Sequence, residues 1–216
     1  MTPDFSNLVY PVITTALDIR DRVERGDPLD LEKERGRLIE LLPANVASGL
    51  QAGYSGDGRI FLGARYALAC WIDELFIVHS SWAERWKPVT LELALFGTRE
   101  RATRFWEQAD IVLGRPGAPK PPDRPGDDAL ETFFLCIVLG FRGTYAEDAA
   151  KVREYVEEMR REVARAADWD QPAELGVKTN IEPLLGREAL RRVVAVYGGL
   201  ALLVVLVLLI LARVLA

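Results

Sequence analysis

Apolar residues recur at the spacing of an α-helix along most of the chain, and they predict a series of helices. The pattern is densest from Arg59 to His79, where nearly every helical face is apolar and the charged interruptions are Arg65, Asp73 and Glu74. A helix that is apolar all round is either a membrane span or the central helix of a soluble bundle. Three charged side chains near a bilayer centre would cost about 2.5–3.5 kcal/mol each. We therefore predict that this segment is the central helix of a soluble domain.

Helices with one apolar face are predicted on both sides of the central helix. In the first of them Pro11 falls in the opening turn, where proline is tolerated, and in the second Pro43 is expected to kink or split the helix. A glycine-rich loop offers Asp57 as the cap of the central helix, and Asp127 or Asp128 is expected to cap a later one. These flanking helices are predicted at residues 8–25, 29–50, 99–113, 129–139 and 147–167.

Two segments between the helices have the composition of a linker and of a tight turn. Residues 114–126, GRPGAPKPPDRPG, contain five of the twelve prolines and no large apolar side chain, which predicts an exposed, semi-rigid linker inside the helical domain. In GFRGTY, residues 140–145, two glycines enclose Phe141 and Arg142. Such a pair of glycines predicts a turn with a specific backbone path.

The C-terminal segment predicts a membrane anchor. Residues 193–212, VVAVYGGLALLVVLVLLILA, carry no charge, and a helix of this length spans the roughly 30 Å of a bilayer core. Three arginines precede the segment and one follows it. The positive-inside rule therefore predicts that residues 1–186 form a cytoplasmic domain and that residues 187–216 form the anchor with a short periplasmic tail. Ala195 and Gly199 form a small-xxx-small pair that fits a contact between two such spans.

Charge and composition limit the classes of function. The net charge of −5 and the pI near 5.1 argue against nucleic-acid binding. Cys70 and Cys136 lie in apolar runs without a CxxC partner, so we expect two buried thiols in a reducing compartment. His79 is the only histidine, and the sequence contains no Gly-x-Ser-x-Gly elbow, P-loop or HExxH motif. The start of the chain does not read as a cleaved signal peptide. We expect no catalytic residue, no metal site and no cofactor.

The acidic pair Asp73–Glu74 is the feature of the central helix that most needs an explanation, because an unpartnered carboxylate in a protein core is costly. One use is internal pairing, with Arg142 as the expected partner. The other is a place in a cleft that receives another protein. The rival interpretation is an enzyme that uses the pair together with His79, although neighbours on a helix point about 100° apart and rarely converge on one substrate.

Trp82 and Trp86 follow the central helix and are four residues apart, so they share a face of a short helix. Two interpretations are open. Both indoles lie on the core, or they form an exposed aromatic anchor for a partner, since Trp is enriched at interface hot spots.

Two segments resemble the signature regions of a known family. ARYALACWIDELFI (64–77), followed by the two tryptophans, and LETFFLCIVLGFRGTY (130–145) are similar to the signature regions of the DotU/IcmH/TssL family, and LFGTRERATRFWEQ (95–108) fits the segment between them. The similarity covers most of residues 8–167, and the single C-terminal span matches the family layout. The chain departs from the family pattern at Thr144, where Arg is preferred, and at Cys70-Trp71, where smaller residues are commoner.

The resemblance implies an all-α, hook-shaped cytoplasmic domain of two packed helical bundles, hung from one C-terminal transmembrane helix in the bacterial inner membrane. It implies a type VI secretion component, or one of the related type IVB systems, that joins TssM-like and TssJ-like proteins, forms a homodimer and docks a TssK-like baseplate protein. The family's use of this region for partner contacts places the interface at Asp73, Glu74, Trp82, Trp86 and Arg142. It also favours a mixture of the two uses of the acidic pair, with Asp73 structural and Glu74 exposed.

Some relatives carry a periplasmic peptidoglycan-binding domain after the span. The chain ends at Ala216, so that activity is expected to be absent. The alternative class is a tail-anchored adaptor unrelated to secretion.

Overall fold

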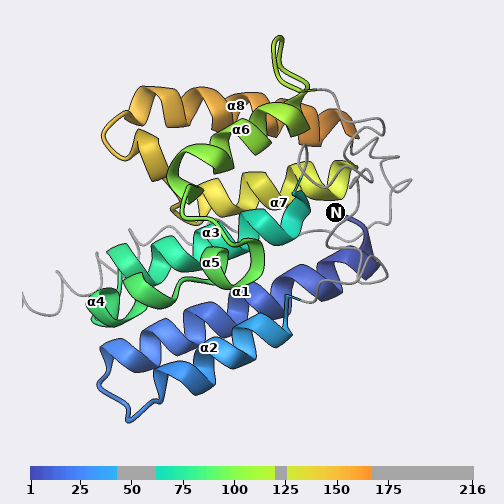
Figure 1. Cartoon of the computed structure of the whole chain (residues 1–216). Helices are drawn as coiled ribbons and strands as arrows, with labels where there is room; N and C mark the ends of the chain where they lie inside the picture. Colours follow the sequence, from blue (N-terminus) through green and yellow to red (C-terminus); the bar gives the residue numbers. More distant parts are fainter. Residues whose placement is uncertain (43–61, 120–125, 167–216) are drawn as a thin grey trace, which may run out of the picture. The chain divides into compact units, whose positions relative to one another are not determined.

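The computed structural model describes residues 1–42, 62–119 and 126–166, and within these ranges the regular elements are all helical (Figure 1). The all-α prediction is confirmed for this part of the chain. The elements are α1 (Pro3–Glu24), α2 (Leu31–Glu40), α3 (Gly63–Val78), α4 (Ala83–Trp86), the 3₁₀ helix η2 (Lys87–Val89), α5 (Leu91–Phe96), α6 (Arg101–Leu113), α7 (Asp127–Val138), the 3₁₀ helix η3 (Gly143–Tyr145) and α8 (Ala149–Ala166).

Helix α3 is the centre of the unit formed by Met1–Asp168, as its apolar pattern predicts. Every residue from Gly63 to Phe76 is buried. The helix packs against α1 on one side and against α6 and α7 on the other, with α4 and α5 also in contact (Figure 1). One hydrophobic core runs through all of these helices. The Arg65 guanidinium within it donates from Nε to Leu42 O at 2.7 Å.

The start of α7 corrects one predicted cap. The N-cap position of α3 is Leu62, whose side chain makes no capping hydrogen bond, and the predicted cap Asp57 lies outside the described residues. The N-cap of α7 is Gly126. Asp127 and Asp128 lie inside the first turn instead, where negative charge is favourable beside the positive end of the helix dipole.

Prolines place the ends of the first two helices differently from the prediction. Helix α1 begins at Pro3, so Pro11 lies inside the helix and not in its opening turn. Pro11 has no N–H to donate, so the helix lacks one backbone hydrogen bond at this position. Nearby, the Thr14 side chain donates from Oγ1 to Tyr10 O at 2.8 Å. Helix α2 ends at Glu40, three residues before Pro43, because the residue before a proline is disfavoured in the helical region. The rest of the predicted helix 29–50 lies outside the described residues.

The predicted linker is anchored at its beginning. Residues 114–119 form no helix, as expected, but the Arg115 guanidinium contacts α8, where it pairs with Glu158 and lies 3.1 Å from Glu154 Oε1. The same guanidinium lies 4.0 Å from the centre of the Tyr155 ring. This end of the segment therefore helps to hold α6 against α8.

The membrane anchor predicted at 193–212, with the pair Ala195 and Gly199, lies outside the described residues. Among the helices within the described ranges, none has both the length and the apolar character of a membrane span. Cys70 on α3 and Cys136 on α7 are fully buried free thiols, as predicted, and burial raises the pKa of both.

Candidate functional site

The Asp73 carboxylate is fully buried and binds the beginning of α5. Its Oδ1 accepts hydrogen bonds from Trp86 Nε1 at 2.8 Å and from Leu91 N at 2.7 Å, and its Oδ2 accepts one from Glu92 N at 2.8 Å. The first backbone N–H groups of a helix have no partner within the helix. Asp73 therefore supplies, from α3, the acceptors that α5 and the preceding tryptophan need.

The Glu74 carboxylate binds a different segment, the turn between α7 and η3. Its Oε1 accepts a hydrogen bond from Arg142 N at 2.6 Å, and the N–H of Gly143 lies 3.2 Å from Oε1 and 3.0 Å from Oε2. The predicted pairing of the acidic pair with Arg142 is thus right about the residue but wrong about the group. The Arg142 guanidinium points elsewhere and donates to Ile137 O and Phe141 O, at 2.7 and 2.8 Å, at the end of α7.

The two carboxylates do not divide their roles as predicted. Asp73 is structural, as expected, but Glu74 is only 8% exposed, so the prediction that it is exposed is wrong. Consecutive residues on a helix point about 100° apart, and here each carboxylate meets a different part of the chain. The enzyme interpretation needs Asp73, Glu74 and His79 to converge. The two carboxylates face separate backbone segments, and His79 is exposed at the end of α3.

A third buried carboxylate, Glu92, escaped the sequence analysis. It is fully buried, and its Oε1 accepts hydrogen bonds from Tyr66 Oη at 3.0 Å, Thr98 Oγ1 at 2.8 Å and Glu100 N at 2.8 Å. Glu92 thereby holds the loop between α5 and α6 against α3. The available signal was a single acidic residue inside the apolar run LELALF, which is the same kind of signal that drew attention to Asp73.

Burial dominates the electrostatics of this cluster. Loss of solvent raises the pKa of Asp73 to about 6, against the lowering effect of its three N–H donors and of the positive charge of Arg101. Burial also raises the pKa values of the Tyr66 hydroxyl and the Cys70 thiol, and the nearby Glu92 adds to both shifts. Backbone and side-chain donors bind these buried carboxylates, which are not presented to solvent.

The two tryptophans after α3 lie on the core. Trp86 is fully buried and Trp82 is 7% exposed. Both rings stack on Phe76, with ring centres 4.3 Å away for Trp86 and 6.0 Å away for Trp82. The core interpretation is confirmed, and neither indole forms an exposed anchor on this chain. A role for these residues in partner binding stays a prediction.

The turn at Arg142–Gly143 is held from two helices at once. Glu74 on α3 accepts from its N–H groups, and Trp106 Nε1 on α6 donates to Arg142 O at 3.0 Å. Gly143 has a φ of +50°, and a Cβ atom added there would lie 2.5 Å from the backbone oxygen of Ala102 on α6. Only glycine fits this position, which confirms the tight turn predicted from GFRGTY.

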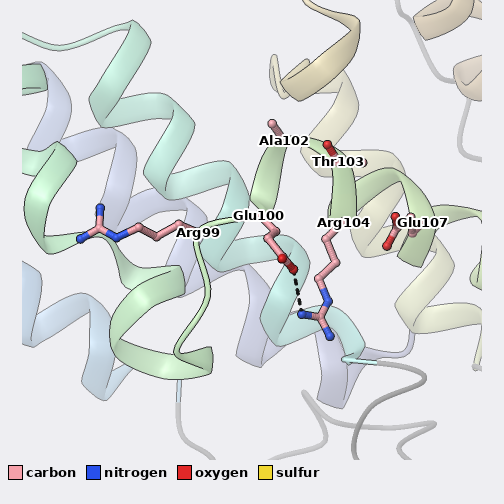
Figure 2. A pocket seen from close by; sticks show the side chains of 6 residues that line it. All are labelled: Arg99, Glu100, Ala102, Thr103, Arg104 and Glu107. Carbon is pink, nitrogen blue, oxygen red and sulfur yellow. Dashed lines mark hydrogen bonds and ion pairs between the residues drawn. The ribbon is translucent and has the colours of Figure 1, made fainter.

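A surface pocket of about 460 Å³ lies at the first turns of α6 (Figure 2). None of the predicted interface residues lines it. Glu100 and Arg104 form an ion pair at 3.3 Å across part of it (Figure 2). Its lining residues are Arg99, Glu100, Ala102, Thr103, Arg104 and Glu107. Within the described ranges, no three His, Cys, Asp or Glu side chains are grouped so that they could hold a metal ion.

Comparison with solved structures shows the fold. The structure described as the cytoplasmic domain of TssL from Acinetobacter baumannii is similar with a TM-score of 0.57 and 24% identity, over 75% of this chain and 98% of that one. The crystal structure of SciP/TssL from enteroaggregative Escherichia coli 042 is similar with a TM-score of 0.52 and 19% identity, over 76% of this chain and 90% of that one.

The sequence comparison identifies the family. No curated protein sequence matches the chain. The family model described as type VI secretion system protein DotU matches residues 4–215, nearly the whole sequence, and agrees with the resemblance carried by the two signature segments. The chain belongs to the DotU family of type VI secretion system proteins.

Proposed function

We propose that this chain is a non-enzymatic scaffold of a type VI secretion system in the bacterial inner membrane. The observation that carries the proposal is the family match over residues 4–215, because it includes both the helical domain and the uncharged segment 193–212. The length and apolar character of that segment favour a single transmembrane helix. Three arginines before it and one after it favour a cytoplasmic N-terminal domain and a periplasmic C-terminus.

The proposed partners are a TssM-like and a TssJ-like protein in the membrane complex and a TssK-like protein of the cytoplasmic baseplate. A homodimer through the membrane spans, with Ala195 and Gly199 at the contact, completes the proposed assembly. Similarity of fold to the structure described as the cytoplasmic domain of TssL supports a cytoplasmic place for the helical unit. We propose that the docking surface is formed by the segments that α3 holds. Of the five residues named from the sequence, Asp73 and Glu74 lie on α3, and Trp82, Trp86 and Arg142 lie on the segments that α3 contacts.

Co-purification from the native host tests this proposal. A chromosomally tagged chain is extracted from membranes in mild detergent, and its bound proteins are identified by mass spectrometry. We expect enrichment of the TssM-like, TssJ-like and TssK-like proteins over a tagged single-span membrane protein of unrelated function. Recovery of type IVB components instead would reassign the system. Recovery of no secretion component at all would contradict the proposed function.

A further inference from the structure

The side chains of Asp73 and Glu74 are almost entirely buried, and their carboxylate oxygens accept hydrogen bonds from within the chain. Asp73 is 0% exposed and Glu74 is 8% exposed. Each of the four carboxylate oxygens accepts at least one N–H from another segment. Because Asp73 is fully buried and Glu74 nearly so, a donor on a partner protein could reach these oxygens only if the covering segments moved and their internal hydrogen bonds broke. A buried N–H left without an acceptor costs about 1–3 kcal/mol, so such an exchange is unfavourable.

The segments that the pair holds do reach the surface. Beyond Asp73, the α4–η2 segment presents exposed side chains at Glu84, Arg85 and Lys87. Beyond Glu74, the end of α7 and the following turn present Leu139 and Thr144, which are also exposed. The exposed parts of both segments thus depend on bonds made by one turn of α3, although that turn itself is buried.

The ends of α3 and α7 carry apolar side chains at the surface. Among the described residues, four large hydrophobic side chains are exposed, and three of them belong to the ends of α3 and α7: Val78 at 62%, Val138 at 53% and Leu139 at 38%. The two helices pack against each other, and Trp71 Nε1 on α3 donates to Leu139 O at 3.4 Å. A shift of the turn after α7 would therefore displace exposed apolar surface as well as the turn.

We infer that Asp73 and Glu74 are positioning residues, which act on partner binding by holding the α4–α5 segment and the α7–η3 turn in place and are not themselves contacted by the partner. The inference rests on the proposed function, because it concerns the docking of the baseplate protein. The two carboxylates hold separate segments, and α3 is buried from Gly63 to Phe76, so it is fixed in the core and does not move with either segment. Each substitution should therefore loosen its own segment and leave the other ordered.

The test compares local order with binding in the full-length chain in detergent micelles. Hydrogen–deuterium exchange reports the order of each segment, and the purified TssK-like protein of the same secretion system is the binding probe. For Glu74→Gln we expect at least tenfold faster amide exchange in residues 139–145 and at least fivefold weaker binding of the probe. Exchange at the beginning of α5 should stay as in the wild type. Asp73→Asn should give the reverse pattern of exchange.

Two further variants separate positioning from direct contact and from general loss of the fold. Trp106→Phe removes the indole N–H that donates to Arg142 O, so it loosens the same turn from α6 while Glu74 stays intact. It should weaken probe binding as Glu74→Gln does. Glu147→Gln neutralises an exposed carboxylate just after the turn and should change neither exchange nor binding. Unchanged exchange in α1 shows that each variant is folded.

The outcomes are distinct. Weaker binding by Glu74→Gln with unchanged exchange at 139–145 would mean that the partner contacts the carboxylate, and it would overturn the inference. Faster exchange with unchanged binding would overturn it as well, since the turn would then have no part in docking, while the proposed function would stand because the wild type binds. Wild-type binding that is absent altogether would refute the docking part of the proposed function, and the inference with it.

Discussion

Gly143 is the position where one added methyl group tests the packing of the α7–η3 turn most directly. Its φ is +50°, and an added Cβ would lie 2.5 Å from Ala102 O and 3.0 Å from Ala102 Cα. The left-handed conformation costs a residue with a Cβ about 1–2 kcal/mol. The contact is with backbone atoms, so no side-chain rotation relieves it, and overpacking of this kind costs about 1–3 kcal/mol. We expect Gly143→Ala to lower the free energy of unfolding by about 2–5 kcal/mol.

Gly97 provides the matched control. Its φ is +70°, but no atom lies within 4 Å of the Cβ that a substitution would add. Gly97→Ala should therefore cost only the conformational part, about 1–2 kcal/mol. Both variants are measured by urea unfolding of residues 1–186, followed by far-ultraviolet circular dichroism and tryptophan fluorescence. If the two substitutions cost the same, the turn is not packed against α6 as described, and the reasoning fails.

Four further outcomes are expected. Gly36→Ala, in the interior of α2 with open space around the added methyl group, should raise the free energy of unfolding by about 0.5–1 kcal/mol, and a loss would contradict this. Trp71→Ala should lower it by about 3–5 kcal/mol, because the indole is buried, and a loss below about 1 kcal/mol would place this side chain outside the core. A chain that ends before Arg187 should be soluble, folded and helical, whereas sedimentation with membranes in the absence of partners would argue against the anchor at 193–212. Burial raises the pKa of Asp73 from 3.8 to about 6, so the contribution of this group to stability is fully present below about pH 4 and is lost as the pH rises through 6, by about 3 kcal/mol. The free energy of unfolding of the wild type, measured relative to that of Asp73→Asn, should therefore fall by about 3 kcal/mol between about pH 4 and pH 7. A difference that does not depend on pH would refute this prediction.

The central helix could be predicted because its pattern has one physical explanation. A run that is apolar on every face and interrupted by charges is too costly for a bilayer and must be buried in protein, and α3 is buried from Gly63 to Phe76. The ends of the helices were harder to predict. A proline can open a helix or lie within it, and Pro3 rather than Pro11 opens α1 because the buried face of the helix already begins at Phe5, one turn before Val9.

For the acidic pair, the sequence predicted the need for hydrogen-bond partners but not which partner each carboxylate has. The cost of a buried carboxylate predicted that the pair needs partners, and the GFRGTY turn was identified correctly as one of them. The sequence could not assign Asp73 and Glu74 to their segments, because helical geometry gives the angle between two side chains but not which neighbours lie in each direction. Backbone N–H groups also carry no sequence signature. For that reason the guanidinium of Arg142 was a natural but incorrect choice of donor.

The burial of both thiols has a practical consequence for labelling experiments. Cys70 and Cys136 are the only cysteines of the chain, and thiols with raised pKa values that solvent does not reach react slowly with maleimides. A cysteine introduced into the tail, for example Val214→Cys, can therefore be labelled in the native background, and a reagent that does not cross membranes then reports on which side the tail lies. The two native thiols keep a use of their own. One sits on α3 and one on α7, so their alkylation records the separation of these two helices.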